Sequence, residues 1–280
     1  MRFTGATNNA GVVTPIVADF GIGQAIHVTK LGVNYRFGGV ARDPSYAPVP
    51  PAQGTNWTGA YVGAQGGYGW GRQTTPDPTF AFAADVPRHD VSGWLAGGTV
   101  GVNAQAGRFV FGVEGEILAT DIKGNFASTL AVPGGPVVTT TLSNKINWLG
   151  LATARAGFTV GDKLLVYGKG GVAIAEQSYN VAATLNAPPT SVALSGKAVS
   201  TGVVIGAGGE YAIAPNWSVK AEYNYVKMFA QGVEYTGVAT GGAFAGGTLA
   251  GFSRVEQDLH LAKFGVNYHF NPQPVVVARY

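Results

Sequence analysis

From residue 55 onward, apolar residues alternate with small or polar residues along a series of strand-length segments. The last segment, 255–270, shows the two parities most clearly: Ala262, Phe264, Val266, Tyr268 and Phe270 on one, and Lys263, Gly265, Asn267 and His269 on the other. Successive side chains of a β-strand point to opposite faces, so this alternation predicts strands with one apolar and one polar face.

Three tight turns, at Ala106-Gly107, Gly161-Asp162 and Pro215-Asn216, separate pairs of these segments. The pattern predicts eight strands: 57–70, 92–105, 108–119, 147–160, 164–175, 198–213, 217–229 and 255–270. The stretches between the pairs are rich in Pro, Gly, Thr and Asn, and we expect them to be loops: 71–91, 120–146, 176–197 and 230–254. Short turns at one rim and long loops at the other are typical of outer-membrane barrels.

The pattern therefore predicts an all-β fold, an eight-stranded antiparallel up-and-down transmembrane β-barrel with long extracellular loops and short periplasmic turns. A soluble barrel of the lipocalin type would show the same alternation with its apolar face turned inward. Three features favour the membrane. Small residues share a face with the charges, aromatic residues gather at strand ends, and charged residues make up only 12% of the chain, against about a quarter in soluble domains.

Composition argues against membrane-spanning helices, cysteine chemistry and nucleic-acid binding. No stretch approaches the ~18 uninterrupted apolar residues that a membrane-spanning helix needs, so the chain can enter a bilayer only as strands. The absence of cysteine excludes disulfides, thiolate catalysis and cysteine metal sites. The net charge of +3 is small and the basic residues are scattered, so we expect no nucleic-acid partner.

The strand parity directs a set of charged residues into the barrel lumen: Glu114, Glu116, Arg155, Lys169, Glu210, Lys220, Glu222 and Lys263. Acids and bases are equal in number, and an eight-stranded barrel encloses little more space than side chains fill. Because buried charges are tolerated only when they are paired, we expect a lumen plugged by salt bridges. The alternative is that the same charges line a narrow ion path.

Aromatic residues near the strand ends predict a girdle at the membrane interfaces, made of Trp57, Tyr68, Trp148, Trp217, Tyr268 and Phe270. The four histidines, His27, His89, His260 and His269, show no metal-ligand spacing, and we interpret them as solvated surface residues rather than haem ligands or bases. No serine has nucleophile-elbow spacing, and phosphate-loop and dinucleotide fingerprints are absent. We expect no enzyme activity, no metal and no cofactor.

The N-terminal part of the chain contains a second copy of the closing strand. Residues 27–37 match 260–270 at seven of eleven positions, including Lys30 with Lys263 and Phe37 with Phe270. We interpret 1–39 as the remnant of an upstream barrel, 40–55 as a Pro-rich linker, 56–270 as the barrel and 271–280 as a tail. The first residues show no signal-peptide core, so export cannot be argued from them.

Four motifs in order resemble the opacity-type outer-membrane immunogenic proteins of alphaproteobacteria. They lie at 56–71 (NWTGAYVG, then GGYGWG), 109–116 (FVFGVEGE), 216–223 (NWSVKAEY) and 263–270 (KFGVNYHF). The resemblance covers residues 55 to 270 and implies a small porin-family barrel in the outer membrane. It implies the lipid bilayer as a partner and the barrel-assembly machinery as another, through the closing strand that ends at Phe270.

Members of that family are described as structural, weakly pore-forming, immunogenic or haem-binding, so the resemblance leaves function open. The leading hypothesis is a structural and surface-interaction protein whose loops meet an extracellular ligand. The alternatives are a small-solute or ion pore and a soluble ligand-binding barrel. This chain departs from the family at both ends, since it lacks a signal peptide and runs past Phe270.

Overall fold

The structure is a computed structural model, and its described residues are 2–9, 12–19, 55–74, 88–131, 134–135, 137–186, 189–241 and 245–270. The chain divides into two units, Met1–Pro50 and Pro51–Tyr280. In the first unit, β1 (Arg2–Asn9) and β2 (Val12–Asp19) form an antiparallel hairpin that the alternation pattern does not predict. The segment 27–37, most of the predicted linker and the tail 271–280 lie outside the described residues.

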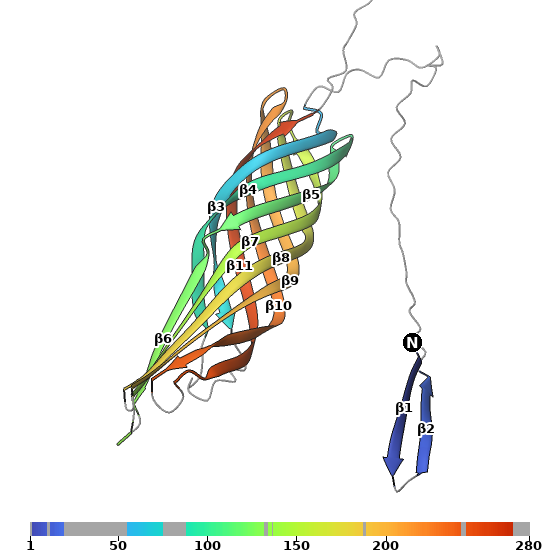
Figure 1. The fold of residues 1–280 in the computed structure, drawn as a ribbon. Coiled ribbons are helices and arrows are strands. Elements are labelled where there is room, and N and C mark those ends of the chain that lie inside the picture. Colours follow the sequence, from blue (N-terminus) through green and yellow to red (C-terminus); the bar gives the residue numbers. More distant parts are fainter. Residues whose placement is uncertain are drawn as a thin grey trace, which may run out of the picture. The chain divides into compact units, whose positions relative to one another are not determined.

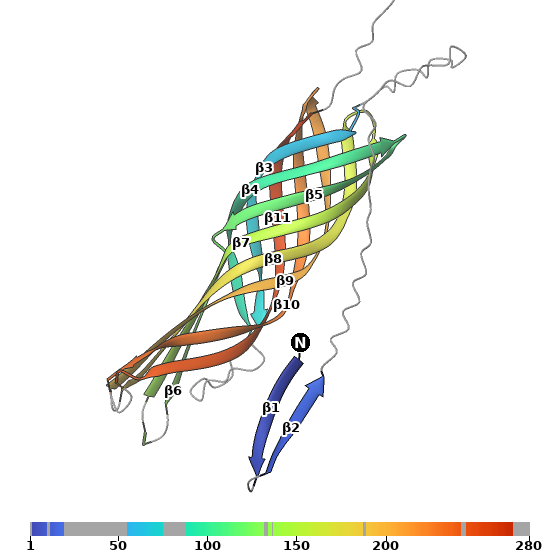
Figure 2. The same ribbon diagram turned by 45° about the vertical axis from the view of Figure 1, so that its right-hand side comes forward.

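The second unit is a closed ring of antiparallel strands (Figures 1 and 2). Its strands are β3 (Gly59–Thr74), β4 (His89–Ala106), β5 (Phe109–Thr120), β6 (Lys123–Ala131), β7 (Val137–Val160), β8 (Leu164–Asn186), β9 (Pro189–Ala214), β10 (Trp217–Thr240) and β11 (Thr248–His269). Each strand pairs with the next in the chain, except that β5 pairs with β7, and β11 pairs with β3 to close the ring. Since β6 continues β5 along β7 after a break at Asp121-Ile122, the barrel has eight strands, as predicted. Among the described residues, no helix is long and apolar enough to span a membrane.

The three predicted tight turns are confirmed at one end of the barrel, which we call the short-turn end. Gly107 and Gly161 each adopt a φ of 62° there, a left-handed conformation that favours glycine. The opposite end differs from the prediction, because most of the expected loops are strand. β7, β8, β9 and β10 run far past the predicted limits and form tall hairpins with β6 and β11 (Figures 1 and 2). Of the first expected loop, only its edges at β3 and β4 are described.

The predicted parity of the strands is confirmed by their exposure. On β11, Phe264 is 70% exposed and the adjacent Lys263 only 1% exposed. On β5, Phe111 and Val113 lie on the outer surface while Glu114 is buried. The outer face is therefore apolar and the inner face carries the charges, which is the reverse of a soluble barrel.

The interior is stacked in layers from the short-turn end to the hairpin end. The inward side chains of β8 give the order: Leu165, Lys169, Ala175, Gln177 and Tyr179. Leu165 belongs to a small apolar cluster at the short-turn end, and Lys169 to the layer of charges. Ala175 belongs to a large apolar cluster, and Tyr179 to a third cluster inside the hairpins. The lumen therefore contains one charged layer between apolar layers, where the sequence predicts charges alone.

Candidate functional site in the barrel interior

Three glutamates and three lysines meet in the middle of the barrel. Lys169 Nζ lies 2.9 Å from Glu114, 2.5 Å from Glu116 and 3.0 Å from Glu222, so one ammonium group joins all three carboxylates. Lys220 Nζ lies 3.1 Å from Glu114 and 3.5 Å from Glu222. Lys263 contacts Glu116 and lies 3.1 Å from Glu222. All six charged ends are buried, so these charges are compensated by one another rather than by bulk solvent.

Arg155 and Glu210 extend the network toward the short-turn end. The Arg155 guanidinium lies 3.2 Å from Glu210 and 3.7 Å from Glu114, and its Nε donates to Asn103 at 2.9 Å. Glu210 also accepts hydrogen bonds from Ser218 at 2.5 Å and Asn267 at 2.7 Å. Several donors therefore hold one buried carboxylate, the arrangement that makes a buried ion tolerable.

Two tyrosines brace the network from opposite sides. Tyr61 donates to Glu114 at 2.8 Å and Tyr167 donates to Glu222 at 2.6 Å. The Arg155 guanidinium lies 4.6 Å from the Tyr61 ring and 5.0 Å from the Tyr167 ring, within cation–π range. A Cβ on Gly101 would fall 2.3 Å from the Tyr61 ring, so glycine at this position is what lets Tyr61 reach across the lumen.

The carboxylates of Glu114, Glu116 and Glu222 lie close enough together to hold a metal ion. Each of them already contacts at least two of the three lysines, which supply the positive charge at that position. The donor set therefore fits a network of ion pairs better than a cation site.

An apolar layer lies directly beyond the charges on the side of the hairpins. Its members come from every strand of the ring except β3 and β6, and most are fully buried: Val91, Leu95, Leu118, Ile122, Ile146, Leu149, Leu151, Ala173, Ala175, Val204, Val226, Met228, Leu259 and Leu261. Ile122, at the break between β5 and β6, is 0% exposed. This layer was not predicted from the sequence. Close packing of such side chains leaves few voids as large as a water molecule, so the layer closes the lumen.

At the short-turn end, Trp57 closes the lumen. It precedes β3, is 1% exposed and packs with Val110, Leu165, Tyr167 and Ala212. Its backbone N–H donates to the Gln105 side chain at 2.8 Å. The prediction of Trp57 in an outer girdle is therefore wrong, because residues 55–58 are not in a strand and the parity rule does not apply to them.

The structure brings all eight predicted lumen charges together inside the barrel. The other five aromatic residues of the predicted girdle, Tyr68, Trp148, Trp217, Tyr268 and Phe270, lie on the outer face, each exposed or half-buried. Trp70 and Trp94 also lie there, and Trp94 is 71% exposed. The predicted girdle did not include these two residues, although the parity of Tyr68 applies equally to Trp70.

Two of the histidines differ from the prediction of solvated surface residues. His89 points inward and its Nε2 lies 3.2 Å from the Asn144 side chain. His269 is buried, with Nε2 2.9 Å from Ser218 and 3.1 Å from Glu210. His260 lies on the outer face, stacked on Trp70, and His27 lies outside the described residues. The parity of β11, which puts His269 on the same face as Lys263, was the signal that could have placed it inward.

On the outer face, aromatic residues occur at two levels of the strands. Trp217 packs edge-on against Tyr268 near the short-turn end, and Tyr68 packs edge-on against Trp94 toward the hairpins. Along β11, the rise from Phe270 to His260 is about 25 Å for a strand tilted by about 40°. That height equals the apolar band of outer-membrane barrels, so fold and surface together define a transmembrane β-barrel.

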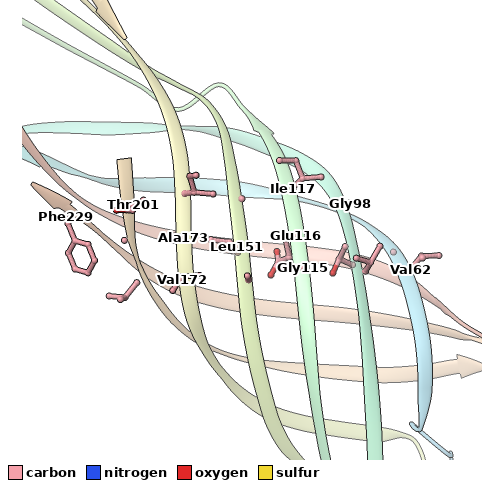
Figure 3. A pocket seen from close by; sticks show the side chains of 18 residues that line it. Val62, Gly98, Gly115, Glu116, Ile117, Leu151, Val172, Ala173, Thr201 and Phe229 are labelled. Atoms are coloured by element: carbon pink, nitrogen blue, oxygen red, sulfur yellow. The ribbon is translucent and has the colours of Figure 1, made fainter. Parts of the chain in front are cut away.

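A shallow apolar groove of about 920 Å³ crosses this lipid-facing surface (Figure 3). Val62, Ile117, Val172 and Phe229, each from a different strand, line it. The small residues Gly115 and Gly150 form part of its floor. The exposed residues that line it have the parity of the outer face, so the groove opens on the lipid-facing surface, although inward-facing residues such as Glu116 and Leu151 also line it.

Beyond the apolar band, the hairpins enclose their own apolar core of Tyr179, Val181, Leu194, Val233, Tyr235 and Val255. Burial raises the pKa of Tyr179 well above its ordinary value, with a further contribution from Tyr235. At the base of the hairpins, Asp121 lies 2.9 Å from Lys123 and 3.2 Å from Lys145. Hydrogen bonds from these two lysines lower the pKa of the exposed Asp121 carboxyl.

Comparison with known proteins places the chain in a family. Residues 45–270 match the outer membrane protein beta-barrel domain, and the chain belongs to that family. It is 32% identical over 201 residues to the 31 kDa outer-membrane immunogenic proteins of Brucella melitensis biotype 1 and Brucella suis biovar 1. That alignment covers 68% of this chain and 78% of either relative. The protein is therefore an outer-membrane β-barrel.

Solved structures of similar fold include OprG from Pseudomonas aeruginosa, with 14% identity, a TM-score of 0.43, and coverage of 78% of this chain and 99% of that one. Ail from Yersinia pestis has 13% identity, a TM-score of 0.32, and coverage of 75% and 99%. These values are too low to carry an argument about function.

Proposed function

We propose that the protein is a closed outer-membrane barrel with a structural and surface-interaction role. The observation that carries this proposal is the content of the lumen, where buried ion pairs are stacked between Trp57 on one side and a continuous apolar layer on the other. An ion that entered would have to displace paired charges and then cross a dry apolar layer. The charges serve stability and specificity of the barrel rather than conduction.

The hairpins are the part that meets the environment. Their inner faces pack around Tyr179 and Tyr235, while their outer faces carry small polar residues such as Thr141, Ser143 and Ser195. A packed hairpin is a more rigid support for recognition than an irregular loop. We propose no catalytic role for these residues, in line with a family of outer-membrane barrels.

Because the chain contains no cysteine, single cysteines report the proposed exposure directly. Ser195→Cys on the hairpins should react with a membrane-impermeant maleimide on intact cells. Asp162→Cys, in a turn at the opposite end, should react only after the outer membrane is permeabilised. Equal labelling of both variants on intact cells, or the reverse order, would contradict a surface role for the hairpins.

A further inference from the structure

Two rows of outward side chains cross β4, β3, β11 and β10 at the outer edge of the apolar band. In the row nearer the hairpins, which we call the charged row, the charges alternate in sign across paired positions: Asp90, Arg72, Asp258 and Lys227. The second row, which we call the aromatic row, lies one step closer to the membrane centre and consists of Ser92, Trp70, His260 and Tyr225. The two rows therefore mark the place where the lipid-facing surface becomes polar.

Specific contacts hold the aromatic row in place. The His260 ring stacks on Trp70 at a centroid distance of 5.8 Å, and its Nδ1 lies 2.6 Å from the Tyr223 hydroxyl. Tyr225 donates to Asp258 at 2.9 Å. These interactions order an exposed surface that has no packing role in the barrel interior.

The cations of the charged row, Arg72 and Lys227, are only loosely paired. Arg72 lies 3.5 Å from Asp90, with 71% and 88% of their side chains exposed, and Lys227 lies 3.9 Å from Asp258. Exposed ion pairs of this kind contribute little, so either cation can change its partner at small cost. Between the rows lies a pocket of about 510 Å³, lined by Trp70, Arg72, Asp90, Tyr225, Asp258 and His260.

We propose that this pocket binds the headgroup of a phosphorylated glycolipid of the outer leaflet. Arg72, in the lining, is placed to donate to phosphate oxygens, for which a guanidinium is well shaped, and Lys227 adds a second positive charge beside Asp258 at the edge of the pocket. Asp90 and Asp258 accept hydrogen bonds from sugar hydroxyls, and the exposed Trp70 ring offers an apolar surface to the sugar ring. A headgroup of phosphate alone would set its charge against both carboxylates, so the mixed chemistry favours a sugar phosphate.

The position of the pocket decides between a lipid and a free solute. Tyr68 and Trp94 lie one step closer to the membrane centre on β3 and β4, at the level where aromatic side chains meet lipid headgroups. A ligand held here by its headgroup leaves its acyl chains against the apolar outer face of β3, β4, β10 and β11. The expected occupant is therefore anchored in the bilayer.

The test is native mass spectrometry of the full chain, refolded in detergent with either lipid A, a phosphorylated diglucosamine glycolipid, or phosphatidylglycerol. The wild type should retain lipid A in preference to phosphatidylglycerol. The variant Arg72→Ala/Asp258→Asn should lose this preference by roughly tenfold or more, the effect of losing one charge-assisted hydrogen bond. Heat-modifiable gel mobility verifies that each variant is folded.

The control is Lys145→Ala, which removes an exposed cation at the base of the hairpins on another strand and should leave lipid A retention unchanged. Equal retention of the two lipids by the wild type would overturn the proposal. So would unchanged retention by Arg72→Ala/Asp258→Asn, or loss in the Lys145→Ala control. Displacement of lipid A by soluble glucosamine phosphate at equal concentration would overturn the membrane-anchored source.

Discussion

At the scale of the residue, Arg155 holds together the part of the charge network that lies toward the short-turn end. It is 3% exposed and bridges Glu210 and Glu114 between two tyrosine rings. Arg155→Ala would leave Glu210 in the barrel interior without its cation. Breaking a buried pair by removing one partner costs about 3 to 5 kcal/mol, so we expect a loss of unfolding free energy of that order.

Urea unfolding in detergent micelles measures this loss. Arg108→Ala is the matched control, because Arg108 is exposed in a turn at the short-turn end and its replacement should change the unfolding free energy little. No difference between the Arg155 and Arg108 variants would contradict the enclosed placement of Arg155.

Single residues also show what alternation can and cannot predict. Lys220 lies between Val219 and Ala221, and Lys169 shares the parity of Leu165 and Tyr167; the structure places both lysines inside. The parity rule fails for Trp57, which is not in a strand, and was not applied to Trp70 and Trp94. Which carboxylate each lysine meets was not predictable, because those contacts join strands far apart in the sequence, such as Lys263 on β11 with Glu116 on β5.

At the scale of the strand, the closing strand β11 carries the lipid-facing parity. Spin labels at Phe270 and Asn267 should differ strongly in their access to a lipid-soluble quencher, because Phe270 is 54% exposed on the outer face and Asn267 is buried. A label at Phe264, which shares the parity of Phe270, is the positive control. Equal access at Phe270 and Asn267 would refute this parity.

Strand ends were harder to predict than strands. The segments 176–197 and 230–254 contain Thr, Val and Tyr, which favour strands, but their Gly, Pro and Asn content indicated loops. The apolar layer was missed for a related reason. Where Ile117 faces lipid and the adjacent Leu118 faces the lumen, both faces are apolar and the alternation disappears. Bulges at Ile146/Trp148 and Met228/Gln231 shift the parity further.

At the scale of the whole molecule, the N-terminal residues should be dispensable for the barrel. The unit Met1–Pro50 is separate by its contacts, and the ring of β3 to β11 closes without it. Deletion of residues 1–54 should therefore leave the heat-modifiable gel mobility of the folded barrel unchanged. Loss of that mobility would show that the segment is integral, as it would be if 27–37 replaced 260–270 beside β3.

The contacts of Thr55 and Trp57 set the limit of that deletion. The Thr55 N–H donates to the Asp162 carbonyl at 2.7 Å, and Trp57 fills the short-turn end of the lumen. A deletion that extends through Trp57 should destabilise the barrel, because the cavity it leaves is lined by Leu165 and Tyr167. The shorter and longer deletions thus form a matched pair in the same gel assay.

The central claim is that the lumen is closed, and single-channel conductance of the purified, refolded full chain in planar bilayers tests it most directly. The buried ion pairs around Lys169 and the apolar layer around Leu118 predict no uniform openings at moderate voltage. Frequent openings of uniform size would contradict the closed lumen and establish the pore instead.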